Sequence, residues 1–256
     1  MDDSTKTIQK KASVSFYDTS AIFQESWIIN QTFVYADKSF KAGKKLNFTD
    51  SIHSYSFPVE KPTTSKFGRR RHSYHKGIDI PLHTGDPVVA VFDGKVRYAT
   101  YNSGGFGKLV IIRHVNGLET FYAHLSRIKV KPNQIVKAGD VIGLGGSTGR
   151  SQSPHLHFEV RYKDKEINPE NLFDLEHYCL KNETAMIGEL MLKNSHHHVN
   201  TVDYSSLAKG DVYSIQAGDT LTKIAAQSGK TVNELCAMNG LTRNSVLQIG
   251  QKIRIN

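Results

Sequence analysis

Residues 153–160, with the sequence SPHLHFEV, place two histidines two positions apart in a run of alternating side chains. Residues i and i+2 of an extended strand point to the same face, so His155 and His157 are predicted to project side by side into one site. Histidine is the commonest metal ligand, but most histidines serve other purposes. The pair therefore predicts a metal site only if further ligands accompany it.

Further candidate ligands lie upstream, where His75 and Asp79 are four residues apart. This even spacing puts both on one face of an extended segment, while Gly77 and a proline at position 81 disfavour a helix. With His155 or His157, they would form a three-ligand nitrogen and oxygen site with a fourth position left to water. That composition is typical of catalytic zinc sites, whereas structural sites are usually closed and rich in thiolates. The spacing does not decide which of the two histidines is the third ligand.

Such a site would need a proton shuttle to hydrolyse a peptide bond. Two neutral imidazoles and one carboxylate leave a Zn²⁺ site positively charged, which can lower the pKa of bound water to about 7. The remaining histidine of the pair and His124, which ends the predicted strand at residues 118–124, are the available general bases or oxyanion stabilisers. The alternative for His124 is a packed polar residue without a catalytic role.

The central part of the chain is predicted to be mainly β. Short strands separated by turn residues indicate an antiparallel sheet, sandwich or barrel. Asp93-Gly94 predicts a hairpin between the first two strands, and Asn116-Gly117 predicts a second hairpin. The strands are expected at residues 88–92, 95–99, 108–114, 118–124 and 141–144.

The two ends of the chain differ from this centre. Residues 1–54 are predicted to be an N-terminal extension with a strand at residues 26–35, either packing on the next domain or covering a site as a regulatory pro-segment. Residues 175–208 are predicted to be a helix and a linker, with His196, His197 and His198 exposed. Residues 209–256 show a strand, two amphipathic helices and a strand, a small α+β (βααβ) domain.

The 256-residue chain has a formal net charge of +9, and 38% of its residues are hydrophobic. The charge favours polyanionic partners such as nucleic acid, anionic lipid or an acidic cell-wall polymer. Nucleic acid is disfavoured because the only tight basic cluster, at residues 69–71, has no interleaved aromatic residues.

No run of about 18 apolar residues occurs, so no transmembrane helix is predicted. The first residues have no apolar leader region, so we expect an intracellular chain or a mature chain from which the signal peptide is absent. Cys179 and Cys236 lie in no Cys-x-x-Cys motif, and Cys236 is predicted to be a buried thiol.

Three separated motifs occur in the central part of the chain: HKGID at residues 75–79, YAHL at residues 122–125 and GRSQSPHLH at residues 149–157. With these motifs, residues 55–174 resemble the lysostaphin/LytM family of zinc endopeptidases. The resemblance implies that His75, Asp79 and His157 bind one Zn²⁺ and that His124 and His155 are the catalytic pair.

The family cleaves peptide bonds in the stem peptides or cross-bridges of peptidoglycan. Some members lack ligands and only activate other wall hydrolases, whereas every motif position is filled here, which favours an active enzyme. The resemblance implies an antiparallel β-sheet groove with zinc on its floor. Glycine-rich loops around Gly104-Gly105 and Gly145-Gly146 are expected to form its walls, although ordinary turn chemistry explains them equally well.

Residues 209–256 resemble a LysM module, which binds glycans containing N-acetylglucosamine. The matching segments are YSIQAGDTL at residues 213–221, NGL at residues 239–241 and LQIGQKI at residues 247–253. Both resemblances imply the same polymer and a place outside the cytoplasm, in the periplasm or cell wall. A linked glycan-binding module would raise the local concentration of the catalytic domain.

We therefore expect a zinc-dependent peptidoglycan endopeptidase, with D-alanyl cross-links preferred over glycyl bridges as the substrate. The alternative is a LysM adaptor that binds peptidoglycan and activates another hydrolase. A pro-enzyme held shut by residues 1–54 is compatible with the first hypothesis. The sequence predicts neither envelope type nor oligomeric state.

Overall fold

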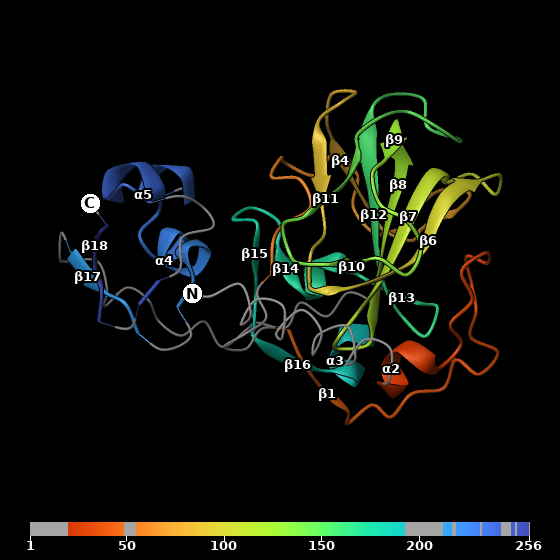
Figure 1. Cartoon of the computed structure of the whole chain (residues 1–256), viewed down its shortest axis with the longest axis horizontal. Helices are drawn as coiled ribbons and strands as arrows, with labels where there is room; N and C mark the ends of the chain where they lie inside the picture. Colours follow the sequence, from red (N-terminus) through yellow and green to blue (C-terminus); the bar gives the residue numbers. More distant parts are fainter. Residues whose placement is uncertain are drawn as a thin grey trace, which may run out of the picture. The chain divides into compact units, whose positions relative to one another are not determined.

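The computed structural model describes residues 20–48, 55–192, 212–216, 219–230, 232–241, 247–248 and 250–255. The chain divides into two compact units (Figure 1). The first comprises Met1–Phe173 and Leu180–Leu192, and the second comprises Asp174–Cys179 and Lys193–Asn256.

A seven-stranded antiparallel sheet forms the centre of the first unit, with its long strands side by side in Figure 1. The strand order is β10-β6-β7-β8-β12-β13, and β4 pairs with β12 on the same edge as β13. This architecture confirms the prediction of a mainly β, antiparallel domain. The strands are β4 (Ile78–Pro81), β6 (Gly94–Asn102), β7 (Gly107–His114), β8 (Leu118–Leu125), β10 (Ile135–Val136), β12 (His155–Tyr162) and β13 (Lys165–Ile167).

Smaller elements surround the large sheet. A three-stranded sheet contains β5 (Pro87–Val89), β11 (Val141–Leu144) and β9 (Arg127–Ile128). Two-stranded pairs are formed by β2 (Gly68–Arg69) with β3 (Tyr74–His75), β1 (Lys45–Asn47) with β16 (Thr184–Met186), and β14 (Phe173–Asp174) with β15 (Cys179–Leu180). The helical segments are α2 (Ala21–Gln24), the 3₁₀ turn η1 (Pro169–Asn171) and α3 (Ile187–Met191).

The alternation along β12 separates an apolar face of the sheet from a polar one. Leu156, Phe158 and Val160 are fully buried on the apolar face. The Phe158 ring contacts Tyr122 and Phe173 there, at centroid distances of 5.5 and 6.3 Å. Burial of such a side chain stabilises the fold by about 1.5–3 kcal/mol. The alternate residues therefore face the other side, which holds the candidate site.

The predicted strand at residues 26–35 does not form. This segment is irregular, and Ser26 has a φ of +50°. Its carbonyl groups accept hydrogen bonds from arginine side chains of the sheet instead of from a neighbouring strand. Side-chain anchoring therefore replaced the strand pairing that its β-branched and aromatic composition predicted.

The predicted hairpin at Asp93-Gly94 is also wrong, because β5 and β6 belong to different sheets. Asp93 is buried and accepts hydrogen bonds from the Ala138 amide at 2.9 Å and the Lys137 ammonium at 2.7 Å. The dipeptide thus marks a crossover between two sheets. The hairpin at Asn116-Gly117 is confirmed, since β7 and β8 pair directly around it.

The second unit contains β17 (Val212–Ser214), α4 (Leu221–Gln227), α5 (Val232–Asn239) and β18 (Lys252–Arg254), which confirms the βααβ prediction. The two strands pair antiparallel. Thr220 caps α4 by accepting a hydrogen bond from the Lys223 amide at 3.1 Å. Cys236 is buried as predicted, within a core formed by Ile215, Leu221, Ile224, Ala225, Leu235, Cys236, Ile253 and Ile255.

Asn239, the last residue of α5, has a polar role. Its side-chain amide donates to the carbonyls of Leu235 and Arg254, and its side-chain oxygen accepts from the Arg254 amide. The residue thereby joins the end of α5 to β18 within this small domain.

The segment predicted as a helix and linker, residues 175–208, is described only as far as residue 192. That part contains β15, β16 and the five-residue helix α3. The triplet at residues 196–198 lies outside the described residues. None of the helices described is long and apolar enough to cross a membrane.

Candidate metal centre

The candidate ligands are brought together by the pairing of β12 with β4. His157 and Asp79 are direct partners in this antiparallel register. His75 belongs to strand β3, and Gly77 lies in the short connection between β3 and β4. A Cβ atom at Gly77 would lie 2.2 Å from the Phe158 carbonyl oxygen, so only glycine lets this connection approach β12 so closely. The position therefore fixes the distance between His75 and His157.

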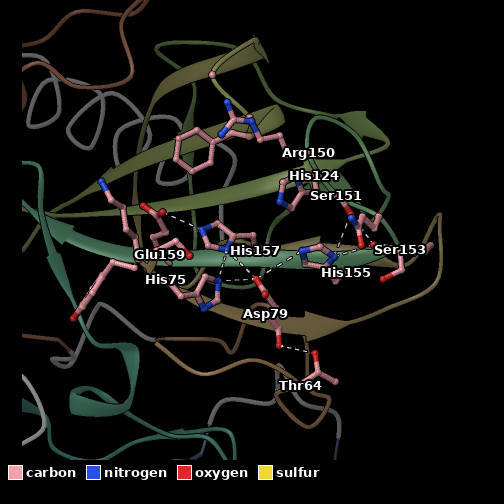
Figure 2. A pocket seen from close by; sticks show the side chains of 18 of the residues that line it. Thr64, His75, Asp79, His124, Arg150, Ser151, Ser153, His155, His157 and Glu159 are labelled. Atoms are coloured by element: carbon pink, nitrogen blue, oxygen red, sulfur yellow. Dashed lines mark hydrogen bonds and ion pairs between the residues drawn. The ribbon is translucent and has the colours of Figure 1, made fainter. Parts of the chain in front are cut away.

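Three atoms converge at this point: His75 Nε2, Asp79 Oδ1 and His157 Nδ1 (Figure 2). The two nitrogens lie 3.1 Å apart, and Asp79 Oδ1 is 3.1 Å from His75 Nε2 and 2.8 Å from His157 Nδ1. Ligand bonds of about 2.0–2.2 Å in a tetrahedral site separate neighbouring ligand atoms by roughly 3.3 Å. The triangle is slightly smaller than that, which a small outward shift of the side chains would correct.

Hydrogen bonds on the far side of each ring fix which nitrogens face the triangle. The Lys66 carbonyl accepts from His75 Nδ1 at 2.8 Å, and the Glu159 carboxylate accepts from His157 Nε2 at 2.9 Å. The two nitrogens that face the triangle, His75 Nε2 and His157 Nδ1, therefore carry lone pairs and lie next to Asp79 Oδ1. Three such atoms repel one another unless a positive centre lies among them. The donor set fits zinc, because each ligating imidazole also has the outer hydrogen bond that usually accompanies a zinc ligand.

A proton can supply that positive centre when no metal is bound. Burial alone would lower the pKa of His157, but hydrogen bonds to the Asp79 and Glu159 carboxylates outweigh it and raise the pKa to about 9. Burial would raise the pKa of Asp79, yet His157 and His75 hold it far below its usual range. Metal must displace the proton shared by Asp79 and His157, so metal binding is expected to strengthen as pH rises.

His155 and His124 lie beside this cluster, as Figure 2 shows. Their ring centroids are 4.8 Å apart, and His155 Nε2 lies 3.7 Å from Asp79 Oδ1. The Ser153 carbonyl accepts from His155 Nδ1 at 2.8 Å, and the Thr148 carbonyl accepts from His124 Nδ1 at 2.7 Å. Nε2 is therefore the nitrogen of each ring that faces away from a backbone carbonyl.

The backbone of His124 distinguishes it from an ordinary packed residue. Its φ of +61° lies in the left-handed region, which costs a non-glycine residue roughly 1 kcal/mol or more and is found often at functional sites. Burial is the main cause that lowers its pKa to about 4. The ring is thus neutral at physiological pH and keeps its proton-accepting nitrogen.

Two supporting residues were given no role by the sequence alone. Glu159 continues the i, i+2 series of His155 and His157, and that spacing could have identified it as a neighbour of the site. Its carboxylate bridges His157 Nε2 and Arg161 Nε, the latter at 2.6 Å. Ser151 lies within the third motif, and its hydroxyl is 3.2 Å from His155 Nδ1. No spacing rule predicts this contact, because an irregular loop creates it.

The five residues singled out by sequence all line one open groove of about 1060 Å³. Pockets for drug-sized ligands measure about 300–1,000 Å³, so this groove has room for a peptide of several residues. Gly104 and Gly105 form part of its wall, as expected. The second loop contributes residues 150–154, whereas Gly145 and Gly146 pack against Leu82 and Ser126.

Two parts of the chain match known protein families. Residues 73–169 match peptidase family M23, and residues 213–256 match the LysM domain. The DD-carboxypeptidase/endopeptidase Mpg of Neisseria meningitidis is 45% identical over 112 residues, covering 41% of this chain and 26% of that protein. The murein hydrolase activator NlpD of Escherichia coli is 42% identical over 118 residues, covering 46% of this chain and 31% of that protein.

Among solved structures, the catalytic domain of lysostaphin from Staphylococcus simulans is similar, with 31% identity and a TM-score of 0.43. The match covers 46% of this chain and 96% of the lysostaphin domain. The chain thus spans only about a quarter to a third of the curated relatives named above. By its two family matches, the protein combines a peptidase family M23 domain with a C-terminal LysM domain.

Proposed function

We propose that this protein is a zinc-dependent endopeptidase that hydrolyses peptide cross-links of peptidoglycan outside the cytoplasm. The observation that carries the proposal is the convergence of His75 Nε2, Asp79 Oδ1 and His157 Nδ1, with two further imidazoles beside them. A relative named as a DD-carboxypeptidase/endopeptidase supports a D-alanyl cross-link as the scissile bond.

In this proposal His75, Asp79 and His157 hold one Zn²⁺. Zinc in a three-ligand site supplies a Lewis acid and activates water near neutral pH. Glu159 and the Lys66 carbonyl orient the two ligating rings, which keeps their inward nitrogens available to the metal.

His155 and His124 carry the proton transfers. In each ring the Nδ1–H donates a hydrogen bond to a backbone carbonyl. Nε2 is therefore the atom that takes a proton from the attacking water and returns it to the leaving amine. The low pKa of His124 keeps its ring neutral across the physiological range.

The LysM domain would bind the glycan strands of the same polymer, at N-acetylglucosamine. Binding there would keep the peptidase domain close to its stem-peptide substrates even when single encounters are weak.

The alternative function is activation of another murein hydrolase, as the relative NlpD is named. It shares the LysM domain and peptidoglycan binding but requires neither bound zinc nor the two histidines. The complete set of five residues favours the enzyme.

The test is mass analysis of fragments released from purified cross-linked peptidoglycan by the full chain, in zinc-loaded, metal-free and zinc-restored forms. We expect new stem-peptide termini in the first and third samples alone. His155→Ala should lower the rate by about 10²- to 10⁴-fold while retaining zinc, whereas His157→Ala should lose both zinc and cleavage.

His83→Ala provides the matched control, because His83 is exposed and does not line the groove. Polymer that is bound but uncut in all three metal states would reject the enzyme and favour the activator. Full activity in either site variant would reject the assigned residues.

A further inference from the structure

Residues 20–35, which we call the N-terminal strap, lie on the polar face of the large sheet (red to orange in Figure 1). Side chains of the sheet bind the strap through its backbone. Arg97 donates to the carbonyls of Ile28 at 3.1 Å, Gln31 at 2.7 Å and Thr32 at 2.9 Å. Arg113 donates to the carbonyl of Ile22 at 3.1 Å. The sheet therefore positions the strap in part through hydrogen bonds to its backbone carbonyls.

Both arginines are held in place by one carboxylate. Glu119 accepts from Arg97 Nε at 2.7 Å and from Arg113 Nε at 2.8 Å, and none of the three side chains is exposed. Two cations and one anion leave a net positive charge in the core, and the strap carbonyls supply the remaining acceptors. Removing the strap would take away the carbonyl acceptors of both guanidinium groups, whose side chains are fully buried in the intact chain. The strap is consequently an integral part of the domain.

Phe33 is fixed between two such attachments. The preceding carbonyl, of Thr32, is held by Arg97, and the following amide, of Val34, donates to Asp164 Oδ2 at 2.9 Å. The Phe33 ring stacks on Phe121 at a centroid distance of 6.1 Å and an interplanar angle of 21°. The Arg161 guanidinium lies 4.9 Å from the ring centroid. A ring held in this way loses little further entropy when it binds a ligand.

Despite these contacts, Phe33 remains 45% exposed, and it lines the same groove as the candidate metal ligands. Phe121, on which it stacks, is the register partner of Glu159 on β12. Phe33 therefore lies toward the Glu159 end of the groove, away from His155. A rigid and exposed aromatic side chain beside a catalytic cluster is the type of residue that contacts a substrate.

We propose that Phe33 is a specificity-determining residue, which binds an aliphatic part of the stem peptide at the Glu159 end of the groove. The inference rests on the proposed function and adds to it a permanent groove wall supplied by the N-terminal strap. The same inference predicts that the strap is not a removable inhibitory segment, because its carbonyls accept hydrogen bonds from buried arginine side chains of the sheet.

The experiment compares zinc-loaded full-length wild type with Phe33→Ala, Phe33→Leu and Ile29→Ala on a soluble cross-linked stem-peptide dimer. Ile29 is the control because it lies in the same strap, is 42% exposed and does not line the groove. Loss of about 50–100 Å² of apolar contact, at roughly 25 cal/mol per Å², should raise the KM of Phe33→Ala about 10- to 50-fold. We expect kcat to change less than KM, zinc content to stay constant and Phe33→Leu to recover most of the affinity.

Calorimetric binding of the same peptide to each protein separates this inference from the proposed function. If wild type cleaves and Phe33→Ala behaves like Ile29→Ala, the role of Phe33 is rejected while the enzyme stands. If no protein cleaves, the proposed function fails, and a selective loss of peptide binding in Phe33→Ala would still support the contact. Equal affinities in all four proteins would reject it.

Truncation before residue 36 tests the strap as a whole. We expect lower stability and lower activity from the truncated chain. Higher activity would identify the strap as an inhibitory cover and overturn the proposal.

Discussion

Two polar clusters share one face of the large sheet, and their hydrogen bonding differs in kind. In the clamp formed by Arg97, Arg113 and Glu119, the charged side chains point at one another and at strap carbonyls. In the metal cluster formed by His75, Asp79 and His157, three acceptor atoms converge on one small region. The clamp is satisfied by the chain itself, whereas the cluster needs a proton or a metal ion from outside.

The comparison shows why burial of charge alone does not identify a functional site. The clamp is the more buried cluster, with all three side chains inaccessible, yet it has a structural role. The metal cluster remains partly accessible from the groove, with Asp79 21% exposed. The metal cluster differs from the clamp because its three acceptor atoms converge at a point that solvent can reach.

The largest stability effect is expected from breaking the clamp with Glu119→Gln. The variant keeps the shape of the side chain but leaves two buried guanidinium groups without their anion, so the free energy of unfolding should fall by about 3–5 kcal/mol. Urea denaturation of the full chain measures this loss.

The control for the clamp is Glu25→Gln, which removes an exposed partner of Lys163 on the strap. Such a surface ion pair contributes about 0–1 kcal/mol. Equal losses in both variants would contradict a structural role for the buried triad.

A smaller effect is expected in the metal cluster from Glu159→Gln. The amide can still accept from His157 Nε2, but it lacks the negative charge that strengthens this hydrogen bond and the pair with Arg161. Zinc affinity should fall by about 10- to 100-fold, measured by competition with a chelator. Unchanged affinity would show that the carboxylate supports the fold and not the metal ligand.

The smallest effect concerns His114, a buried imidazole outside both clusters. Its ring nitrogens lie 3.2 Å from the Asp93 carbonyl oxygen and 2.6 Å from Thr120 Oγ1, and burial lowers its pKa from 6.5 to about 4. Between these values the unfolded chain binds a proton that the folded chain does not, so acid destabilises the fold. The contribution is complete above pH 6.5 and is lost as pH falls toward 4.

Between pH 7 and pH 5.5, His114 should reduce the free energy of unfolding by about 1 kcal/mol. Urea denaturation of wild type and His114→Asn at both values isolates this term, because other titrating groups are common to both proteins. The same pH dependence in both proteins would contradict the assignment.

Local sequence features predicted many of the parts correctly. The i, i+2 histidines, the alternating strands and the βααβ pattern of the C-terminal domain each depend on neighbours within a few residues, and the structure bears them out. The structure also brings the predicted site residues together in one groove, and their roles as ligands and catalysts are proposals; these residues are His75, Asp79, His124, His155 and His157. The domain boundaries at residues 54, 174 and 208 likewise stay predictions.

The failures occurred where a residue's partner is distant in sequence. Residues 26–35 have the composition of a strand, yet arginine side chains 65 to 87 positions away donate hydrogen bonds to their carbonyls. Asp93-Gly94 has the composition of a hairpin turn, but Asp93 is held by the backbone and side chains of residues 137 and 138. Local sequence propensity does not predict these contacts, because their partners are distant in sequence.

The sequence by itself determined the motifs, the strand periodicity and the LysM pattern, because these follow from spacing along one segment of chain. Tertiary structure brought His157, the ligand that the family resemblance implies, together with His75 and Asp79 through the register of β12 on β4. It also placed Phe33 in the groove and Glu159 behind His157. The physical reason is that strand register and side-chain anchoring are set by packing across the sheet, which spacing along the chain does not contain.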